Sequence, residues 1–135
     1  MSDKINKRVH DVMKDKIDFV DGMTTVRDAL SKMKHVETKT LIVNKRNDDD
    51  EYGIVLISDI ARKVLAKNLS PDRTNVYEIM SKPVITVGPD MNIRYCARLF
   101  TEFGLSRAPV VDNGKMVGIV SLADMVLKGM MSANT

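Results

Sequence analysis

The sequence predicts a mixed α/β (α+β) fold made of two successive copies of one β-α-β-β-α unit. Three observations support this prediction. The chain of 135 residues repeats its own pattern, each half has one amphipathic segment of helical period, and each half has two short β-branched runs. A chain of this length has the usual size of one compact domain. We therefore expect two repeats with pseudo-two-fold symmetry, packed together into one module.

The repeat is visible as matching motifs in the two halves. Val12-Met13 recurs as Ile79-Met80, and Gly53–Val55 recurs as Gly118–Val120, with an aspartate a few residues later in both places. The spacing between matching residues changes only at expected loops. We place the first repeat at residues 9–68, a linker at 69–75 and the second repeat at 76–131.

Each repeat contains one predicted helix with an apolar face. The apolar residues follow the i, i+3, i+4, i+7 spacing of an amphipathic helix in both halves. They are Val26, Ala29, Leu30 and Met33 in the first repeat, and Ile93, Cys96, Ala97 and Phe100 in the second.

Two β-branched runs follow each of these helices and predict strand pairs. They cover Thr40–Asn44 and Gly53–Ile57, then Ala108–Asp112 and Met116–Val120. Asn113-Gly114 joins the second pair and is a strong signal for a two-residue hairpin, whereas a longer charged loop at residues 45–51 joins the first. Each repeat then ends in a second helix, at Asp59–Asn68 and Leu122–Met131.

The second helices carry more apolar residues than one small core needs. These residues are Val64, Leu65, Met125, Val126, Leu127 and Met130. A homodimer formed through these faces is therefore expected.

Composition argues against several classes of protein. The 21 basic and 18 acidic side chains are mixed along the chain, so no basic patch for nucleic acid is predicted. No apolar run is long enough to cross a membrane, and we expect a cytoplasmic protein. Cys96 is the only cysteine of the chain, so an internal disulfide is excluded. The two histidines lack suitably spaced partners, so we predict neither a metal site nor a catalytic centre. We expect no enzyme and no catalytic cofactor.

The segments Arg107–Asp112 and Gly118–Asp124, set behind Ile79-Met80 and a predicted strand, resemble the CBS domain family. The first half resembles it too, so the resemblance runs from about Val9 to Met130. It implies a Bateman module, in which two CBS repeats bind AMP, ADP, ATP, S-adenosylmethionine or a similar adenosyl ligand in the clefts between them. Such proteins are sensors and often dimers.

The family pattern assigns the binding residues of one cleft. Asp124 would accept hydrogen bonds from both ribose hydroxyls, Ser121 would contact ribose or phosphate, and Arg107 would hold the phosphate. The adenine face would come from the opposite repeat, around Asp18 and Thr38, largely through backbone groups. Taken alone, Ser121 and Asp124 are better explained as a helix N-cap with an acidic residue three positions on, and Arg107 as a solvated surface charge. The family resemblance favours the binding roles over these explanations.

The symmetric cleft is expected to bind more weakly. It retains Asp59, and Ile85 would supply the opposing strand, but Leu56 stands where the other cleft has Ser121. Lys39 is matched with Arg107. The lysine keeps the positive charge but lacks the planar guanidinium group that can bind phosphate through two hydrogen bonds.

Two hypotheses for function remain, besides a nucleic-acid binder that the charge pattern argues against. The first is a regulatory sensor of an adenosyl ligand. The second is a dimerising protein-interaction module with vestigial clefts, acting on a partner that the sequence does not identify.

Overall fold

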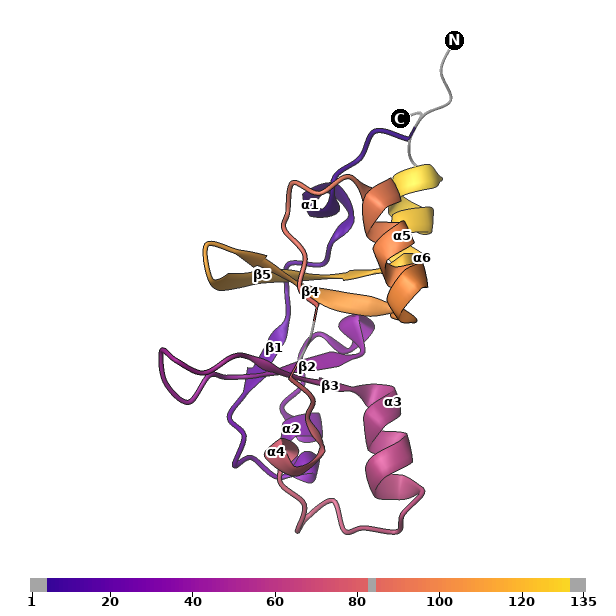
Figure 1. Cartoon of the computed structure of the whole chain (residues 1–135). Coiled ribbons are helices and arrows are strands. Elements are labelled where there is room, and N and C mark those ends of the chain that lie inside the picture. Colours follow the sequence, from indigo (N-terminus) through magenta and orange to yellow (C-terminus); the bar gives the residue numbers. More distant parts are fainter. Residues whose placement is uncertain (1–4, 83–84, 132–135) are drawn as a thin grey trace. The chain divides into compact units, whose positions relative to one another are not determined.

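The computed structural model describes residues 5–82 and 85–131, and Figure 1 labels their helices and strands. The chain divides into two compact units, one from residues 16–83 and the other from residues 1–15 together with 84–135. We call them the central unit and the terminal unit. The α+β architecture predicted from the sequence is confirmed.

The central unit is a three-stranded sheet with helices. Its sheet order is β1-β2-β3, with β1 parallel to β2 and β2 antiparallel to β3. Its elements are β1 (Asp18–Val20), α2 (Val26–Ser31), a 3-10 helix (Val36–Thr38), β2 (Thr40–Val43), β3 (Gly53–Leu56), α3 (Ile57–Ile60) with a π-helical continuation (Ala61–Leu65), and α4 (Val76–Ile79). The buried core consists of apolar residues from α2, β2, β3, the π-helical continuation of α3, and α4, including Val26, Ala29, Leu41, Val55, Val64 and Val76.

The terminal unit contains the hairpin that the sequence predicts. Strand β4 pairs antiparallel with β5, and the turn residues Asn113 and Gly114 have φ angles of 51° and 79°. These positive values are what a two-residue hairpin turn requires. Its elements are α1 (Val9–Val12), α5 (Ile93–Phe103), β4 (Arg107–Asp112), β5 (Lys115–Ser121), and α6 (Leu122–Asp124) with a π-helical continuation (Met125–Met130).

One predicted strand of the terminal unit is absent from its described residues. The sequence predicts a strand through Ile85, matching β1, but only Val87 makes a parallel bridge, to Val110. Residues 83 and 84 lie outside the described part of the chain. Backbone bonds of 3.1 Å from Val87 N to Pro109 O and 2.9 Å from Val111 N to Val87 O hold this short contact.

The two amphipathic helices begin where the sequence predicts. The Thr25 side chain accepts a hydrogen bond from Asp28 N at the start of α2, and the Asn92 side chain accepts one from Arg94 N at the start of α5. Such caps satisfy backbone N–H groups that have no partner inside the helix. The expected faces are buried at Val26 and Ala29, and at Ile93, Cys96 and Phe100, whereas Leu30 is exposed.

Each compact unit includes a short helix from the beginning of the other sequence repeat. In the terminal unit, Val9 N donates to Met91 O, and Lys14 exchanges two backbone hydrogen bonds with Ile119. Figure 1 shows α1, coloured indigo, beside the orange and yellow elements from the end of the chain. In the central unit, Val76 N donates to Thr24 O. The compact units therefore do not coincide with the two expected sequence repeats.

The strand register corrects one equivalence between the repeats. Arg107 lies opposite Ser121, and the residue opposite Leu56 is Thr40. The backbone agrees, because Leu122 N donates to Ser106 O and Ile57 N donates to Lys39 O. Thr40, and not Lys39, therefore occupies the position of Arg107. The mismatch arises because apolar strand residues can be aligned in neighbouring registers, whereas only backbone pairing decides between them.

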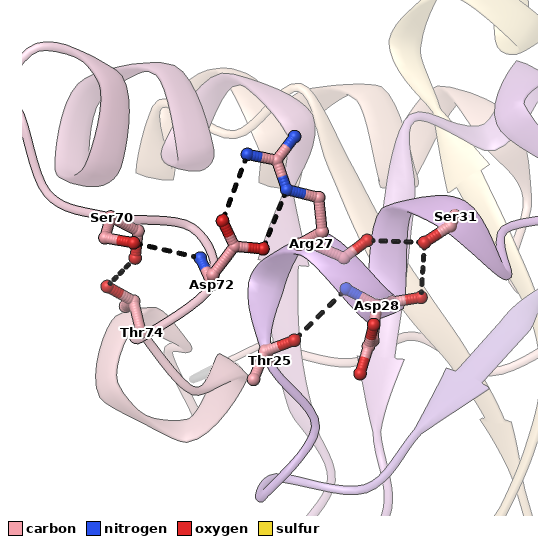
Figure 2. A network of polar contacts seen from close by, with 7 residues as sticks. All are labelled: Thr25, Arg27, Asp28, Ser31, Ser70, Asp72 and Thr74. Carbon is pink, nitrogen blue, oxygen red and sulfur yellow. Dashed lines mark hydrogen bonds and ion pairs between the residues drawn. The ribbon is translucent and has the colours of Figure 1, made fainter.

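Polar contacts tie the linker to α2 within the central unit (Figure 2). The Arg27 side chain donates to both carboxylate oxygens of Asp72, at 2.9 and 3.3 Å, and Thr74 Oγ1 donates to Ser70 O at 2.8 Å. The Arg27–Asp72 hydrogen bond raises the pKa of Arg27. Because this ion pair is exposed, it orients the linker more than it stabilises the fold.

The charged loop between β2 and β3 is closed by one of its own carboxylates. The Asp50 side chain accepts hydrogen bonds from Arg46 N and Arg46 Nε, and Lys82 Nζ lies 3.1 Å away. These bonds, led by that from the Arg46 backbone, hold the pKa of Asp50 well below its usual range. Among the described residues, no group of three or more His, Cys, Asp or Glu side chains is placed to hold a metal ion.

The second helices divide their apolar residues between core and surface. Val64 and Met125 are buried, whereas other members of the predicted dimer face are exposed: Leu65, Val126, Leu127 and Met130. In the part of the chain that the structure describes, no helix has both the length and the apolar character needed to span a membrane.

Candidate ligand-binding site

Arg107 and Ser121 lie together at one end of the β4–β5 hairpin. They are directly opposite in the antiparallel register, so their side chains project from the same face. Ser121 is buried, and its hydroxyl accepts a hydrogen bond of 3.1 Å from Asp124 N. The capping interaction considered from the sequence is therefore present. It leaves the hydroxyl hydrogen of Ser121 available to donate.

Asp124 carries a buried carboxylate that is surrounded by cations. Its side chain is 8% exposed, and Lys14 Nζ lies 2.5 Å from its Oδ2. Lys128 Nζ lies 3.9 Å from Oδ1, one helical turn further along. A carboxylate oxygen accepts hydrogen bonds from ammonium and from hydroxyl donors alike.

Lys14 is a functional candidate that the sequence analysis missed. Its side chain reaches Asp124 across 110 residues of sequence, because the segment after α1 pairs with β5 inside the terminal unit. No motif spacing brings these two residues together. The available signal was its position directly after Val12-Met13, where the other repeat has Ser81 after Ile79-Met80.

Asp18, expected near the adenine, has a carboxylate that organises a turn in the central unit. Its two oxygens accept hydrogen bonds from Lys34 N and His35 N, at 2.9 and 2.8 Å. The carboxylate is thus engaged within its own unit. A cavity of about 210 Å³ lies beside Asp18 and is also lined by Phe19, Ala29, Lys32 and Met33.

Thr38, the second residue expected near the adenine, belongs to the same turn. It is buried, its Oγ1 donates to His35 O at 2.9 Å, and it accepts from Thr40 N at 3.3 Å. Asp18 and Thr38 therefore fix one stretch of the central unit, between α2 and β2. Their predicted role in ligand binding stays a prediction.

The residues expected in the weaker cleft lack the features of the first. Asp59 turns back toward its own helix, where its Oδ2 accepts from Leu56 N at 2.9 Å. Lys39 is exposed and has a positive φ of 55°, and it lies one residue before β2. Ile85, in the terminal unit, packs against the buried cluster that includes Val87 and Phe100.

The fold and these sites define an α+β module of two repeats. Residues 9–66 and 76–129 match the CBS domain family. The chain therefore belongs to the CBS domain family.

Several known proteins are similar to this chain. An uncharacterized protein of Methanopyrus kandleri, MK0525, is 36% identical over 104 residues, which cover 76% of this chain and 52% of that protein. The chain thus spans about half the length of this relative. The hexameric CBS-CP12 protein from bloom-forming cyanobacteria has 36% identity and a TM-score of 0.86, over 96% of this chain and 71% of that chain.

A third similar structure contains ligands. The CBS domain pair of protein MJ0100, solved in complex with 5′-methylthioadenosine and S-adenosyl-L-methionine, has 22% identity and a TM-score of 0.74. The match covers 96% of this chain and 99% of that chain. At this identity, the similarity shows the fold alone.

Proposed function

We propose that this protein is a regulatory module that binds an adenine nucleotide or another adenosyl ligand. CBS domain pairs generally bind adenosyl compounds, as the pair of MJ0100 does with two of them. The proposal assigns Asp124 to the ribose, Ser121 to ribose or phosphate, and Arg107 to phosphate. The region around Asp18 and Thr38 would contact adenine.

The observation that carries the proposal is the polar cluster at the end of the hairpin in the terminal unit. Arg107 and the Ser121 hydroxyl lie on one face of the hairpin, and the buried Asp124 carboxylate belongs to the helix whose start Ser121 caps. A ribose offers two adjacent hydroxyl donors, and a carboxylate can accept both in charge-assisted hydrogen bonds. The corresponding positions of the central unit are Thr40, Leu56 and Asp59, so a site there would be weaker or empty.

Ligand binding would act by shifting an equilibrium between two states of the protein. Such a shift requires different affinities for the ligand in the two states, and the coupling free energy is typically about 1 to 3 kcal/mol. A change in self-association is one such equilibrium, because exposed apolar residues such as Leu127 and Met130 are available to form a homodimer.

Isothermal titration with AMP, ADP, ATP, S-adenosylmethionine and NAD at fixed salt tests this proposal. We expect saturable binding of at least one adenosyl compound at about one site per chain, and a matching rise in the melting temperature, because a ligand specific for the folded state stabilises it. No heat and no thermal shift across the whole panel would overturn the proposal.

One observation favours the alternative, an interaction module with vestigial clefts. Three binding positions of the central unit are occupied by Thr40, Leu56 and an Asp59 that is committed to its helix. If the panel is silent, this alternative predicts concentration-dependent self-association that no adenosyl compound changes. Analytical ultracentrifugation with and without each ligand measures this directly.

A further inference from the structure

A site in which Asp124 only binds ribose does not explain why Lys14 forms an ion pair with Asp124. If two ribose hydroxyls bind the Asp124 carboxylate, they compete with the Lys14 ammonium group, which now lies on Oδ2. The Lys14 side chain is only 25% exposed, and its backbone is fixed by two hydrogen bonds of 2.9 Å with Ile119. The Lys14 ammonium group therefore has few alternative positions within the site. If a mostly buried ammonium group loses its carboxylate partner, it needs another anion, because an unpaired buried charge is unfavourable.

The charges around this carboxylate favour an anionic ligand. Lys14 and Lys128 both face Asp124, and Arg107 projects from the face that carries Ser121. Two cationic side chains thus face one carboxylate, and a third belongs to the neighbouring strand position. A phosphate supplies several strong acceptor oxygens, so it can pair with the ammonium group that the ribose displaces. A neutral or cationic tail cannot compensate in this way.

The central unit shows the same backbone arrangement without this cation. Ser81 pairs with Ile54 as Lys14 pairs with Ile119. Lys63, the counterpart of Lys128, donates instead to Ile79 O at 3.0 Å. The fold of a repeat therefore does not require a lysine at the position of Lys14. This difference argues for a role beyond folding.

We propose that Lys14 selects the ligand of this site by charge, so that adenosine carrying a 5′-phosphate binds in preference to adenosine compounds with an uncharged or cationic tail. The inference rests on the proposed function and narrows its ligand class to nucleotides. In the bound state Lys14 contacts the phosphate, and Asp124 accepts from the ribose. A purely structural ion pair would stabilise the fold equally whichever adenosyl compound is bound.

Calorimetric titration of the full chain with AMP, adenosine and 5′-methylthioadenosine, at one ionic strength, tests this inference, because neither of the last two carries an anionic group. We expect the wild-type protein to bind AMP at least about tenfold more tightly than the other two, as the loss of a charge-assisted hydrogen bond implies. Lys14→Gln should weaken AMP binding by about tenfold and should not weaken adenosine binding, which becomes equal or tighter because no ammonium group has to leave Asp124. Lys14→Arg should retain the preference.

Lys115→Gln is the matched control, since Lys115 is an exposed lysine in β5 of the same unit and the substitution removes the same charge. It should leave both affinities unchanged. An equal effect of Lys115→Gln and Lys14→Gln would overturn the inference, because general electrostatic attraction would then explain the preference. Equal binding of adenosine and AMP by the wild-type protein would overturn it without any variant. Absence of binding by every adenosyl compound would instead overturn the proposed function.

Discussion

The ends of β3 and β5 are equivalent positions in the two units, so the side chains there can be compared directly. Each strand is followed by a helix with an aspartate in its first turn, yet the two carboxylates make different contacts. Asp59 accepts from Leu56 N and caps its own helix, whereas Asp124 faces Lys14 and leaves the capping role to Ser121. The two helices thus begin with different side-chain contacts, a carboxylate that accepts from Leu56 N in one and a hydroxyl that accepts from Asp124 N in the other.

The neighbouring positions differ in the same direction. The terminal unit has the cationic residues Arg107 and Lys14 where the central unit has the uncharged Thr40 and Ser81, and it has Ser121 where the central unit has Leu56. The backbone pairing is the same in both units. The comparison teaches that the fold supplies the position of a ligand site, and that a few side chains decide whether a site is present.

Among the substitutions that test this comparison, we expect the largest difference in ligand affinity between variants of the two aspartates. Asp124→Ala should weaken ligand binding by about 100-fold, because it removes an acceptor of two charge-assisted hydrogen bonds. Asp59→Ala should change binding at this site less than about twofold, since its carboxylate contacts only its own helix. Titration with the tightest-binding compound of the panel measures both variants. Equal losses would show that the two units contribute equally, contrary to our proposal.

A smaller effect is expected at two glycines of matching position. A Cβ on Gly118 would lie 2.7 Å from Met13 Sδ and 2.8 Å from Lys14 O, so the backbone that carries Lys14 would have to move. Gly118→Ala should destabilise the protein by about 2 kcal/mol and also weaken ligand binding.

Gly53→Ala is the matched variant in the central unit. Its Cβ would meet Met80 Sδ at 2.6 Å and Val43 Cβ at 3.1 Å, and a methionine side chain can move aside. We expect a cost of about 1 kcal/mol and unchanged ligand binding. Urea unfolding measures both stabilities. A larger cost at Gly53 than at Gly118 would contradict this account of the contacts.

The smallest effect is expected at Cys96. Its thiol reports on the terminal unit alone, because the matching position in the central unit is Ala29. Cys96 is fully buried, and burial raises the pKa of its thiol to about 11. Since the thiolate is the reactive form, a disulfide reagent at pH 8 should react negligibly with the folded protein. Reaction should appear once denaturant opens the terminal unit. Rapid labelling without denaturant would show that this unit opens readily.

The sequence predicted those parts of the fold that local patterns encode. The helix faces at Val26 and Ile93 and the Asn113-Gly114 hairpin are confirmed, because periodic burial and turn geometry act over a few residues. The predicted strand through Ile85 was wrong for the described residues, where only Val87 pairs. A short parallel contact leaves too few residues for a recognisable pattern.

The parts that could not be predicted depend on contacts between distant segments. The match of Lys39 to Arg107 was wrong because several registers place apolar residues equally well, and backbone pairing selects Thr40. Lys14 was missed because its partner, Asp124, is 110 residues away. Ligand binding by Arg107, Ser121 and Asp124 stays a prediction, for which the side-chain cluster in the terminal unit provides support.

The exchange of short helices between the sequence repeats has a consequence for how the protein is made. The central unit is one continuous stretch, residues 16–83, so all of its residues are synthesised before β4 and β5 are. The segment with Val9 and Val12, both fully buried in the finished protein, must stay exposed until then, for a time on the order of seconds at ordinary rates of translation. A chain released after residue 83 would hold all residues of one unit together with an exposed apolar segment, which is the kind of surface that chaperones bind.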